Sequence, residues 1–242
     1  MASAPFLVVD GLTKSYGGLL ANNAVSFTVQ AGELLGLIGP NGAGKSTVFE
    51  LITGFQRPEA GHVRLEGREL VGLRADRINR LGVARTFQKL RPFQQMTVQE
   101  NVMVGALQRS RDLHEARAEA LEALHFVGLL EKRHAHARML STGQRKRLEL
   151  ARAMATRPRL LLLDEVSGGV DQRSIPALVA LIERLRERGT TLIVIEHNMQ
   201  VLMSLADRIV ALHLGRKIAE GTPEAIRADR AVIESYLGAA YA

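Results

Sequence analysis

The chain has 242 residues, of which 46% are hydrophobic and 24% charged, and it contains no cysteine. This composition is typical of a folded globular protein with one substantial core, and it excludes disorder, disulfide bonds, thiolate zinc sites and cysteine nucleophiles. The net charge of +7 suits nucleic acid or an anionic lipid surface, but basic and acidic residues alternate, which favours a solvated surface near an acidic membrane.

The N-terminal part of the chain is predicted to contain short strands and one helix. Phe6–Val9 and Val25–Val29 are strands with polar interruptions, which indicates an antiparallel edge. Leu34–Ile38 is a nearly continuous apolar strand, followed by a glycine-rich loop and a helix over about Lys45–Gly54. His62–Leu65 is a further strand. This order of strand, loop and helix is the context that a phosphate-binding loop requires.

The middle of the chain has a helical pattern. Between residues 89 and 157, apolar residues recur at spacings of three and four, as in Leu121, Leu124 and Val127. We therefore predict a helical subdomain over 89–157, inserted in a core formed by 1–88 and 158–242.

Buried strands return in the last third of the chain. Leu160–Leu163, Leu192–Ile195 and Ile209–Leu212 are predicted strands, and Ile175–Arg188 is a helix between them. A terminal helix is expected after Thr222, which is a good N-cap. The predicted fold class is α/β, with a mostly parallel sheet, an antiparallel β edge subdomain and an inserted α-helical subdomain.

The strongest chemical signal is a phosphate-binding loop over residues 39–47. The loop consists of Gly39, Pro40, Asn41, Gly42, Ala43, Gly44, Lys45, Ser46 and Thr47. It satisfies GxxxxGK[ST], in which backbone N–H groups and the helix N-terminus surround one anion. Lys45 would add charge at the β- and γ-phosphates, and Ser46 would ligate Mg²⁺. The loop predicts binding of a nucleoside triphosphate.

Two carboxylates follow the apolar strand Leu160–Leu163. Asp164 would hold Mg²⁺ through water, and Glu165 would orient or deprotonate the attacking water. An acidic pair after a strand can also simply cap the next helix. The phosphate loop favours the catalytic interpretation.

Two more polar residues are candidates for the site, and the first of them would emerge at the same edge of the sheet. His197 follows another apolar strand, and its imidazole is either a structural group or a contact to a γ-phosphate oxygen. Gln88 would offer an amide to Mg²⁺ or to the water, although an isolated Gln is usually structural.

A second anion site is predicted at residues 140–144, which we call the signature segment. It consists of Leu140, Ser141, Thr142, Gly143 and Gln144. Ser141 can cap a basic helix that begins near Gln144, and the free N–H groups there attract an anion. An ordinary capped basic helix is the alternative.

Taken in order, these motifs resemble the full set of the ATP-binding-cassette (ABC) ATPases. The set comprises Tyr16, residues 39–47, Gln88, the signature segment, residues 160–165, Asp171 and His197. The resemblance implies ATP and Mg²⁺ as cofactors, adenine stacking on Tyr16, and contact of Gln88 and its following segment with membrane subunits. It also implies that the signature segment meets the γ-phosphate bound by a second subunit, and that Asp171 lies in a subunit-communication loop.

Shorter segments are similar to one branch of that family. These are Ala84–Gln88, Met96–Val102, Ile195–Met199, Glu220–Pro223 and Tyr236–Gly238. They resemble the ATP-binding subunits of branched-chain amino acid importers, of the type called G. The implied partners are a second ATPase subunit, in a homo- or heterodimer, two membrane-spanning permease subunits and a solute-binding protein, with no nucleic acid.

Other functions share parts of this pattern. The same chemistry occurs in urea or amide importers and in the lipopolysaccharide exporter, and non-transport ABC ATPases act on nucleic acid or ribosomes. A P-loop kinase would not require Ser141. No apolar run approaches the roughly 20 residues that cross a bilayer, which predicts a cytosolic chain. The resemblance implies a peripheral position at the cytoplasmic face of the inner membrane.

The sequence departs from the family pattern at three points. Thr142 replaces the commonest glycine of the signature segment, and Val166 stands where the family usually has proline after the catalytic Glu. Residues 167–171 form an altered loop. Because proline's fixed φ is absent and two glycines are adjacent, this loop is predicted to be looser than usual. ATP binding is predicted to remain intact.

Overall fold

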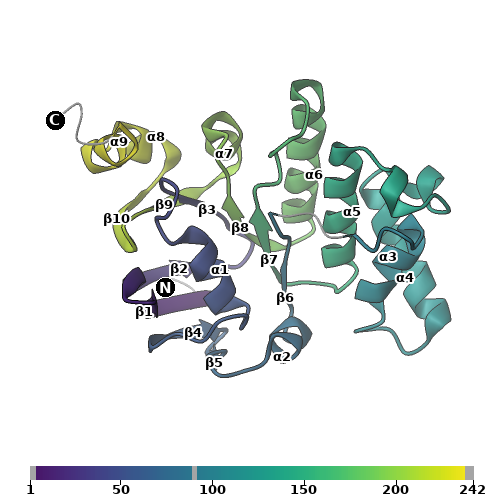
Figure 1. The fold of residues 1–242 in the computed structure, drawn as a ribbon, viewed down its shortest axis with the longest axis horizontal. Helices are drawn as coiled ribbons and strands as arrows, with labels where there is room; N and C mark the ends of the chain where they lie inside the picture. The colour runs from purple at the N-terminus through teal and green to yellow at the C-terminus, as the bar shows by residue number, and fades with distance from the viewer. Residues whose placement is uncertain (1–3, 89–91, 238–242) are drawn as a thin grey trace.

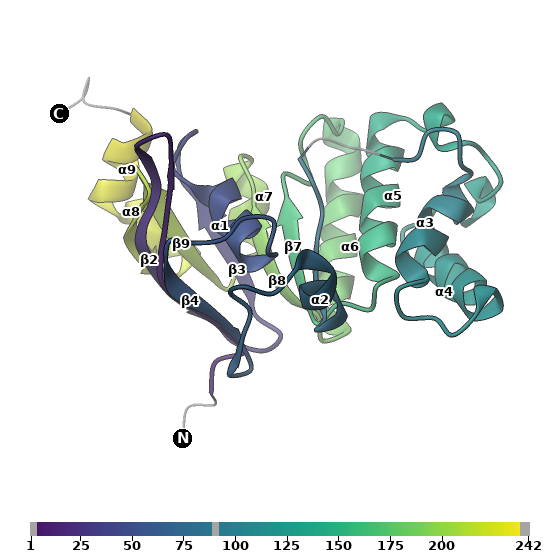
Figure 2. The same cartoon turned by 60° about the horizontal axis from the view of Figure 1, so that its bottom comes forward.

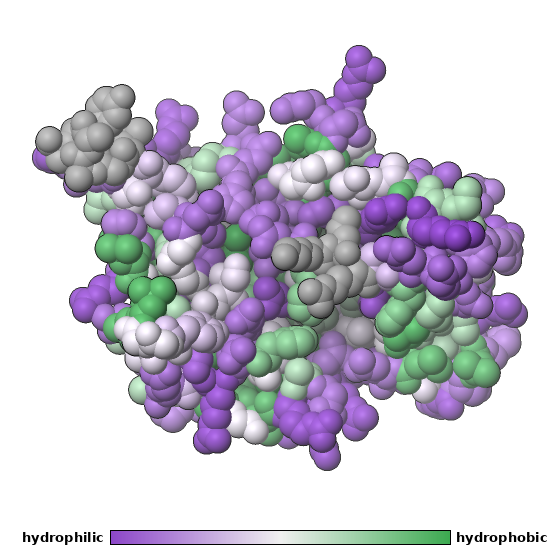
Figure 3. Space-filling model, in the orientation of Figure 1, coloured by the Kyte–Doolittle hydropathy of each residue, from purple (hydrophilic) through white to green (hydrophobic). Residues whose placement is uncertain are grey.

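The computed structural model describes residues 4–88 and 92–237, and the structural statements below concern these residues. The helices of the middle of the chain lie together at one end of the molecule, an antiparallel sheet lies toward the other end, and a larger sheet lies between them (Figures 1 and 2). The face in Figure 3 is mostly hydrophilic, with hydrophobic side chains in separate small areas. No helix within the described residues is long and apolar enough to span a bilayer.

The larger sheet has six strands. In spatial order they are β10 (Arg216–Gly221), β9 (Arg208–His213), β3 (Leu34–Ile38), β8 (Thr191–Ile195), β7 (Leu160–Asp164) and β6 (Val83–Arg85). All neighbouring pairs are parallel except β10 and β9. Every residue of β3, β7 and β8 is buried, as expected for strands covered on both faces.

The smaller sheet is antiparallel and has four strands. Their order is β2 (Leu19–Val29), β1 (Leu7–Tyr16), β4 (Ala60–Leu65) and β5 (Arg68–Glu69). Its buried face includes Leu7, Val25 and Val63, and packs in one cluster with residues of the first helix and of the larger sheet. The smaller sheet therefore lies over the elements that hold the phosphate loop.

The described residues contain nine α-helices. They are α1 (Lys45–Ile52), α2 (Ala75–Arg80), α3 (Val98–Ala106), α4 (Leu113–Phe126), α5 (Thr142–Met154), α6 (Ile175–Glu187), α7 (Met199–Leu205), α8 (Pro223–Ala228) and α9 (Arg230–Leu237). Short 3-10 segments cover 130–132, 137–139 and 172–174. The predicted insert begins at residue 89, which lies outside the described residues, and its described part contains α3, α4 and α5.

Several elements differ from the sequence prediction. The first strand extends to Tyr16, because it pairs on both sides with β2 and β4. The helix predicted to end at Gly54 ends at Ile52, and Gly54 has a φ of +72° that leaves the helical region. Elements α2, α7, β5, β6 and β10 were not predicted, since short segments show too little periodicity.

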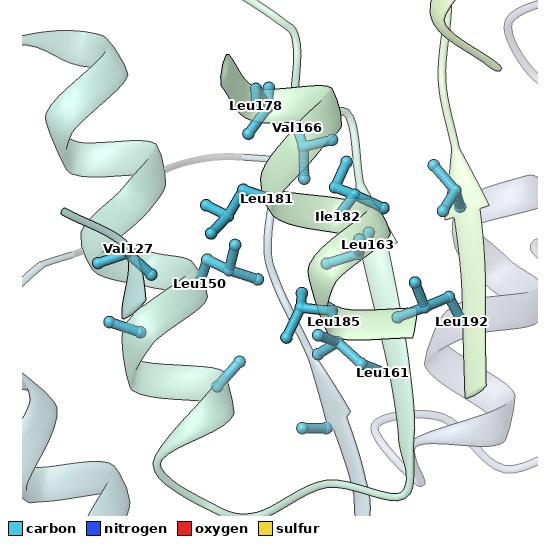
Figure 4. Close-up of a cluster of buried hydrophobic side chains, with 14 of the residues drawn as sticks. Val127, Leu150, Leu161, Leu163, Val166, Leu178, Leu181, Ile182, Leu185 and Leu192 are labelled. Carbon is cyan, nitrogen blue, oxygen red and sulfur yellow. The ribbon is translucent and has the colours of Figure 1, made fainter. Parts of the chain in front are cut away.

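A hydrophobic cluster joins α5 and α6 to the sheet. Figure 4 shows Leu150 of α5 and Leu181 of α6 beside Leu161 and Leu163 of β7. All four side chains are buried. This packing holds the helix that follows the signature segment against the strand that precedes Glu165.

Candidate functional site

The phosphate loop is shaped by glycines at tight backbone contacts. A Cβ on Gly39 would lie 2.1 Å from the carbonyl oxygen of Leu212, and the φ of Gly39 is +146°. A Cβ on Gly44 would lie 2.3 Å from the carbonyl oxygen of Ala21, and Gly44 is the N-cap of α1 with a φ of +96°. A side chain at either position would displace the loop from the strands beneath it.

Lys45 lies inside the phosphate loop. Its Nζ donates to the carbonyl oxygens of Gly39 at 2.6 Å and Pro40 at 3.0 Å, and the residue is only 7% exposed. Burial lowers the pKa of Lys45, whereas the charges of Glu165 and Asp164 oppose that shift. The loop thus places one cation beside two carboxylates.

Glu165 accepts two side-chain contacts at the same oxygen. Nε2 of Gln88 donates to its Oε1 at 2.8 Å, and Nε2 of His197 lies 2.8 Å from the same atom. Glu165 has a φ of +50°, which is unusual for a residue with a side chain. The structure therefore brings three residues of the sequence prediction into direct contact.

The parallel register of the sheet explains this convergence. Arg85 at the end of β6 lies opposite Leu162 of β7, so the next residues run beside the end of β7. Asp164 lies opposite Ile195 of β8, and the N–H of Glu165 donates to the carbonyl oxygen of Ile195 at 2.9 Å. Parallel strands deliver their following residues to one edge of the sheet.

Asp164 forms an ion pair that the sequence analysis did not identify. Nη2 of Arg85 donates to its Oδ2 at 2.8 Å, and both side chains are buried. The guanidinium carbon of Arg85 lies 5.5 Å from the ring centre of Phe49 and 5.2 Å from that of Phe87. Arg85 thus orients Asp164 from the side of β6; the sequence analysis included Arg85 in the segment Ala84–Gln88 but assigned it no role.

An open cavity of about 390 Å³ joins the phosphate loop to the other candidates. Its lining includes residues 41–47, Gln88, Glu165, His197, Leu19, Leu20 and Leu214. The three leucines are exposed and form its apolar part, which the sequence analysis missed. A cavity with cationic, amide and apolar walls suits a nucleotide.

Tyr16 lies next to this cavity and is not among its lining residues. Its hydroxyl donates to Glu50 at 3.3 Å, and Nζ of Lys14 lies 5.2 Å from its ring centre. Burial raises the pKa of Tyr16, and the charge of Glu50 raises it further. The ring is 41% exposed and remains accessible to a ligand.

The signature segment faces a different cavity. Ser141 caps α5, as the sequence predicts, although the helix begins at Thr142 and not near Gln144. Ser141 and Gln144 also form a capping box. Ser141, Gly143 and Gln144 line a cavity of about 190 Å³ together with Asp171, which caps residues 172–174. The signature segment and Asp171 are thus side by side, and neither lines the cavity of the phosphate loop.

Two charged residues of α5 contact the backbone of Glu165 and Phe87, and the sequence analysis did not identify them. Nζ of Lys146 donates to the carbonyl oxygen of Glu165 at 2.5 Å. Oε1 of Glu149 accepts from the N–H of Phe87 at 2.5 Å. Burial raises the pKa of Glu149 to about 7, although the Phe87 N–H, Lys146 and Arg152 act in the opposite direction.

The loop after Glu165 is fastened by side-chain contacts. The N–H and hydroxyl of Ser167 donate to the carboxylate of Glu196 at 2.8 and 2.6 Å. Val166 is 5% exposed and packs beside Leu178 of α6 (Figure 4). Val166 therefore adds an apolar contact between this loop and α6.

The C-terminal helix also contacts the phosphate loop. The hydroxyl of Tyr236, in α9, accepts from the N–H of Gly39 at 2.8 Å. Burial raises the pKa of this tyrosine. Gly238 ends the segment Tyr236–Gly238 of the sequence analysis and lies outside the described residues.

Two residues that line the cavity and one buried carboxylate beside it would fit Mg²⁺: Ser46 and Gln88 line the cavity, and Asp164, which directly precedes the lining residue Glu165, is 2% exposed. A hydroxyl from Ser46, an amide from Gln88 and the carboxylate of Asp164 supply the oxygen atoms that this ion prefers. Ser46 is exposed to the cavity, and Arg85 keeps one carboxylate oxygen of Asp164 oriented.

The comparisons with known proteins identify similar sequences over nearly the whole chain. A family described as "ABC transporter" matches residues 22–168, and a family described as "Branched-chain amino acid ATP-binding cassette transporter" matches residues 216–242. The high-affinity branched-chain amino acid transport ATP-binding protein BraF of Pseudomonas aeruginosa is 44% identical over 98% of this chain and 100% of its own length. The corresponding protein LivG of Escherichia coli (strain K12) is 42% identical with the same coverage.

Solved structures confirm the fold class. An ATP-binding cassette of an ABC transporter in its ADP conformation has a TM-score of 0.88 and 28% identity, over 98% of this chain and 100% of that chain. A dimeric cassette in a post-hydrolysis state bound to ADP and Pi has a TM-score of 0.82 and 27% identity, over 90% and 98%.

Proposed function

This chain belongs to the ABC transporter family and is an ATPase subunit of the branched-chain amino acid type, and we propose that its hydrolysis of ATP powers uptake of branched-chain amino acids through membrane-spanning permease subunits. The observation that supports this best is the joint placement of Lys45, Glu165 and His197 at one cavity. The solute follows from the similarity to BraF and LivG.

Binding of ATP is assigned to the phosphate loop and the apolar wall. The N–H groups of residues 41–47 and the charge of Lys45 would hold the phosphates. The adenine would lie against Tyr16, near the exposed side chains of Leu19 and Leu20. Ser46 and Asp164, with Gln88, would hold Mg²⁺, which when bound neutralises charge on the phosphates.

The hydrolytic step is assigned to Glu165 and its two contacts. Glu165 would orient and deprotonate the water that attacks the γ-phosphate. Gln88 and His197 hold its Oε1, which fixes the direction of the carboxylate, and His197 would also contact a γ-phosphate oxygen. Lys45 stabilises the negative charge that develops in the transition state.

A second ATPase subunit would complete the site. The signature segment and Asp171 share a cavity separate from that of the phosphate loop of the same chain. We assign the signature segment to a nucleotide held by the partner subunit, in a homo- or heterodimer. Two permease subunits and a solute-binding protein complete the proposed importer, with this chain at the cytoplasmic face of the membrane.

The test uses the complex of this chain with the membrane subunits that co-purify with it. ATP hydrolysis is measured in proteoliposomes while binding protein loaded with leucine, isoleucine or valine is added. The expected result is a several-fold stimulation by these solutes and none by urea or short amides. Stimulation by urea alone, or by lipopolysaccharide, would overturn the assigned solute and leave the ATPase assignment intact.

A further inference from the structure

Helix α5 has two charged side chains, one turn apart, that reach out of the helix toward the catalytic edge of the sheet. Lys146 is buried and donates to the backbone carbonyl of Glu165 at 2.5 Å. Glu149 is half-buried and accepts from the backbone N–H of Phe87 at 2.5 Å. Residues three apart share one face of a helix, so a single face of α5 contacts both segments.

These contacts close a ring of interactions around the reacting edge. Phe87 directly precedes Gln88, whose Nε2 donates to the side chain of Glu165. The ring runs from Glu149 through Phe87 and Gln88 to Glu165, and then through Lys146 back to α5. A rotation of α5 relative to the sheet therefore strains contacts to both catalytic segments at once.

The same helix begins at the signature segment. Ser141 is its N-cap, five residues before Lys146, and its first turn lines the cavity shared with Asp171. The helix core is rigidly packed, since Leu148 and Leu150 are fully buried or nearly so. A displacement at the N-terminus of α5 is thus transmitted to the face that contains Lys146 and Glu149.

We propose that Lys146 and Glu149 are positioning residues that couple the orientation of α5, and with it the signature segment, to Gln88 and Glu165 in the same chain. The proposal rests on the function proposed above. It connects the cavity of the phosphate loop, where this chain would bind its own nucleotide, with the signature segment, which would contact the nucleotide of the partner subunit.

Burial makes Glu149 an unfavourable choice for stability alone. Removing a carboxylate from water is costly unless it is hydrogen-bonded, and an apolar residue would fill the same groove at lower cost. Its Oε1 accepts from the backbone N–H of Phe87, in the loop that contains Gln88, and the charges of Lys146 and Arg152 also favour the carboxylate. A positioning role for the carboxylate oxygen that accepts from Phe87 would explain why a carboxylate stands at position 149.

The test compares Glu149→Met with Glu149→Gln in the full-length chain. Both substitutions remove the charge and keep a similar length, but only glutamine retains an oxygen that accepts from Phe87. Loss of one hydrogen bond at a positioned loop predicts about a tenfold fall in kcat for E149M, with KM for ATP within about twofold of wild type. E149Q is expected to remain within about twofold in both constants.

The matched control is Glu122→Ala. Glu122 is an exposed carboxylate of α4 that pairs with the exposed Arg188, and its removal should leave hydrolysis unchanged. Melting temperatures of all variants separate a folding defect from a catalytic one. Should E149M fold poorly, Glu149→Ala tests the same acceptor with a smaller side chain.

A double-mutant cycle with Gln88→Ala identifies the route of the effect. If Glu149 acts through Gln88, the two losses in kcat are not additive, and the double variant resembles Q88A. Additive losses, or equal losses in E149M and E149Q, would overturn the proposal while wild-type hydrolysis still supports the ATPase. Absence of hydrolysis in the wild-type chain would instead contradict the proposed function.

Discussion

Nε2 of His197 lies 2.8 Å from Oε1 of Glu165, although 32 residues separate them in the chain. The parallel pairing of β7 with β8 brings them together, since Asp164 lies opposite Ile195. The contact fixes the orientation of the carboxylate proposed as the general base. The roles of Glu165 and His197 can be tested by substituting each residue separately.

Glu165→Gln should abolish hydrolysis and keep ATP binding. The amide has the same shape but cannot accept a proton, so we expect kcat to fall at least about 100-fold. The affinity for ATP, measured with a fluorescent analogue, should stay within a few-fold. With ATP present, the variant should accumulate as a dimer in light scattering. A persistent monomer would count against the proposed mechanism.

His197→Ala should lower kcat by about 100-fold, with a much smaller effect on ATP affinity. The physical reason is loss of the contact that orients Glu165. The control is His125→Ala, because His125 is an exposed residue of α4. Equal activity of H197A and wild type in a steady-state phosphate-release assay would show that His197 is only structural.

Gly39→Ala should destabilise the fold. The new Cβ would lie 2.1 Å from the carbonyl oxygen of Leu212, at a φ of +146°. We expect a loss of at least about 2 kcal/mol in the free energy of unfolding, measured by urea denaturation. Gly143→Ala is the control, since its Cβ would meet nothing within 4 Å. Similar stabilities of the two variants would refute this packing argument.

The raised pKa of Glu149 predicts that the stability of the fold depends on pH. Its pKa is raised to about 7 in the folded chain, so between pH 4.5 and 7 the folded state binds more protons than the unfolded state. The free energy of unfolding therefore falls as the pH rises through this window, by at most about 3 kcal/mol.

Glu149→Gln should remove this pH dependence of the free energy of unfolding, because the amide does not titrate. The melting temperature of E149Q relative to wild type should be higher at pH 8 than at pH 5. The measurement is thermal unfolding at both values in matched buffers. A difference that is independent of pH would mean that Glu149 titrates at its ordinary pKa.

The sequence alone was sufficient for the long apolar strands and the phosphate loop. The run Leu34–Ile38 and the glycines after it predict their structure locally, since burial and backbone freedom are properties of those residues. The sequence also predicted that His197 follows a strand at the same sheet edge as Glu165, whereas the contact of Gln88 was not predicted, because strand β6 before it was missed. The prediction for His197 follows from the rule that parallel strands end at one edge.

The remaining features depend on contacts between distant segments. Arg85 pairs with Asp164 across 79 residues, and Glu149 reaches Phe87 across 62. Neither residue belongs to a pattern that signals its partner. Tyr236 likewise meets Gly39 only because α9 folds back over the start of the phosphate loop. Such contacts require the three-dimensional register of the sheets and helices.

In a dimer of two copies of this chain, each catalytic site is expected to combine Glu165 of one copy with Ser141 of the other. The direct measurement is ATP hydrolysis by Glu165→Gln chains, by Ser141→Arg chains, and by both after co-expression. Each variant alone should be inactive, whereas random pairing should restore about a quarter of wild-type activity, because half of the dimers contain one intact site. Absence of activity in the co-expressed sample, with both chains folded and dimeric, would contradict a site shared between two chains.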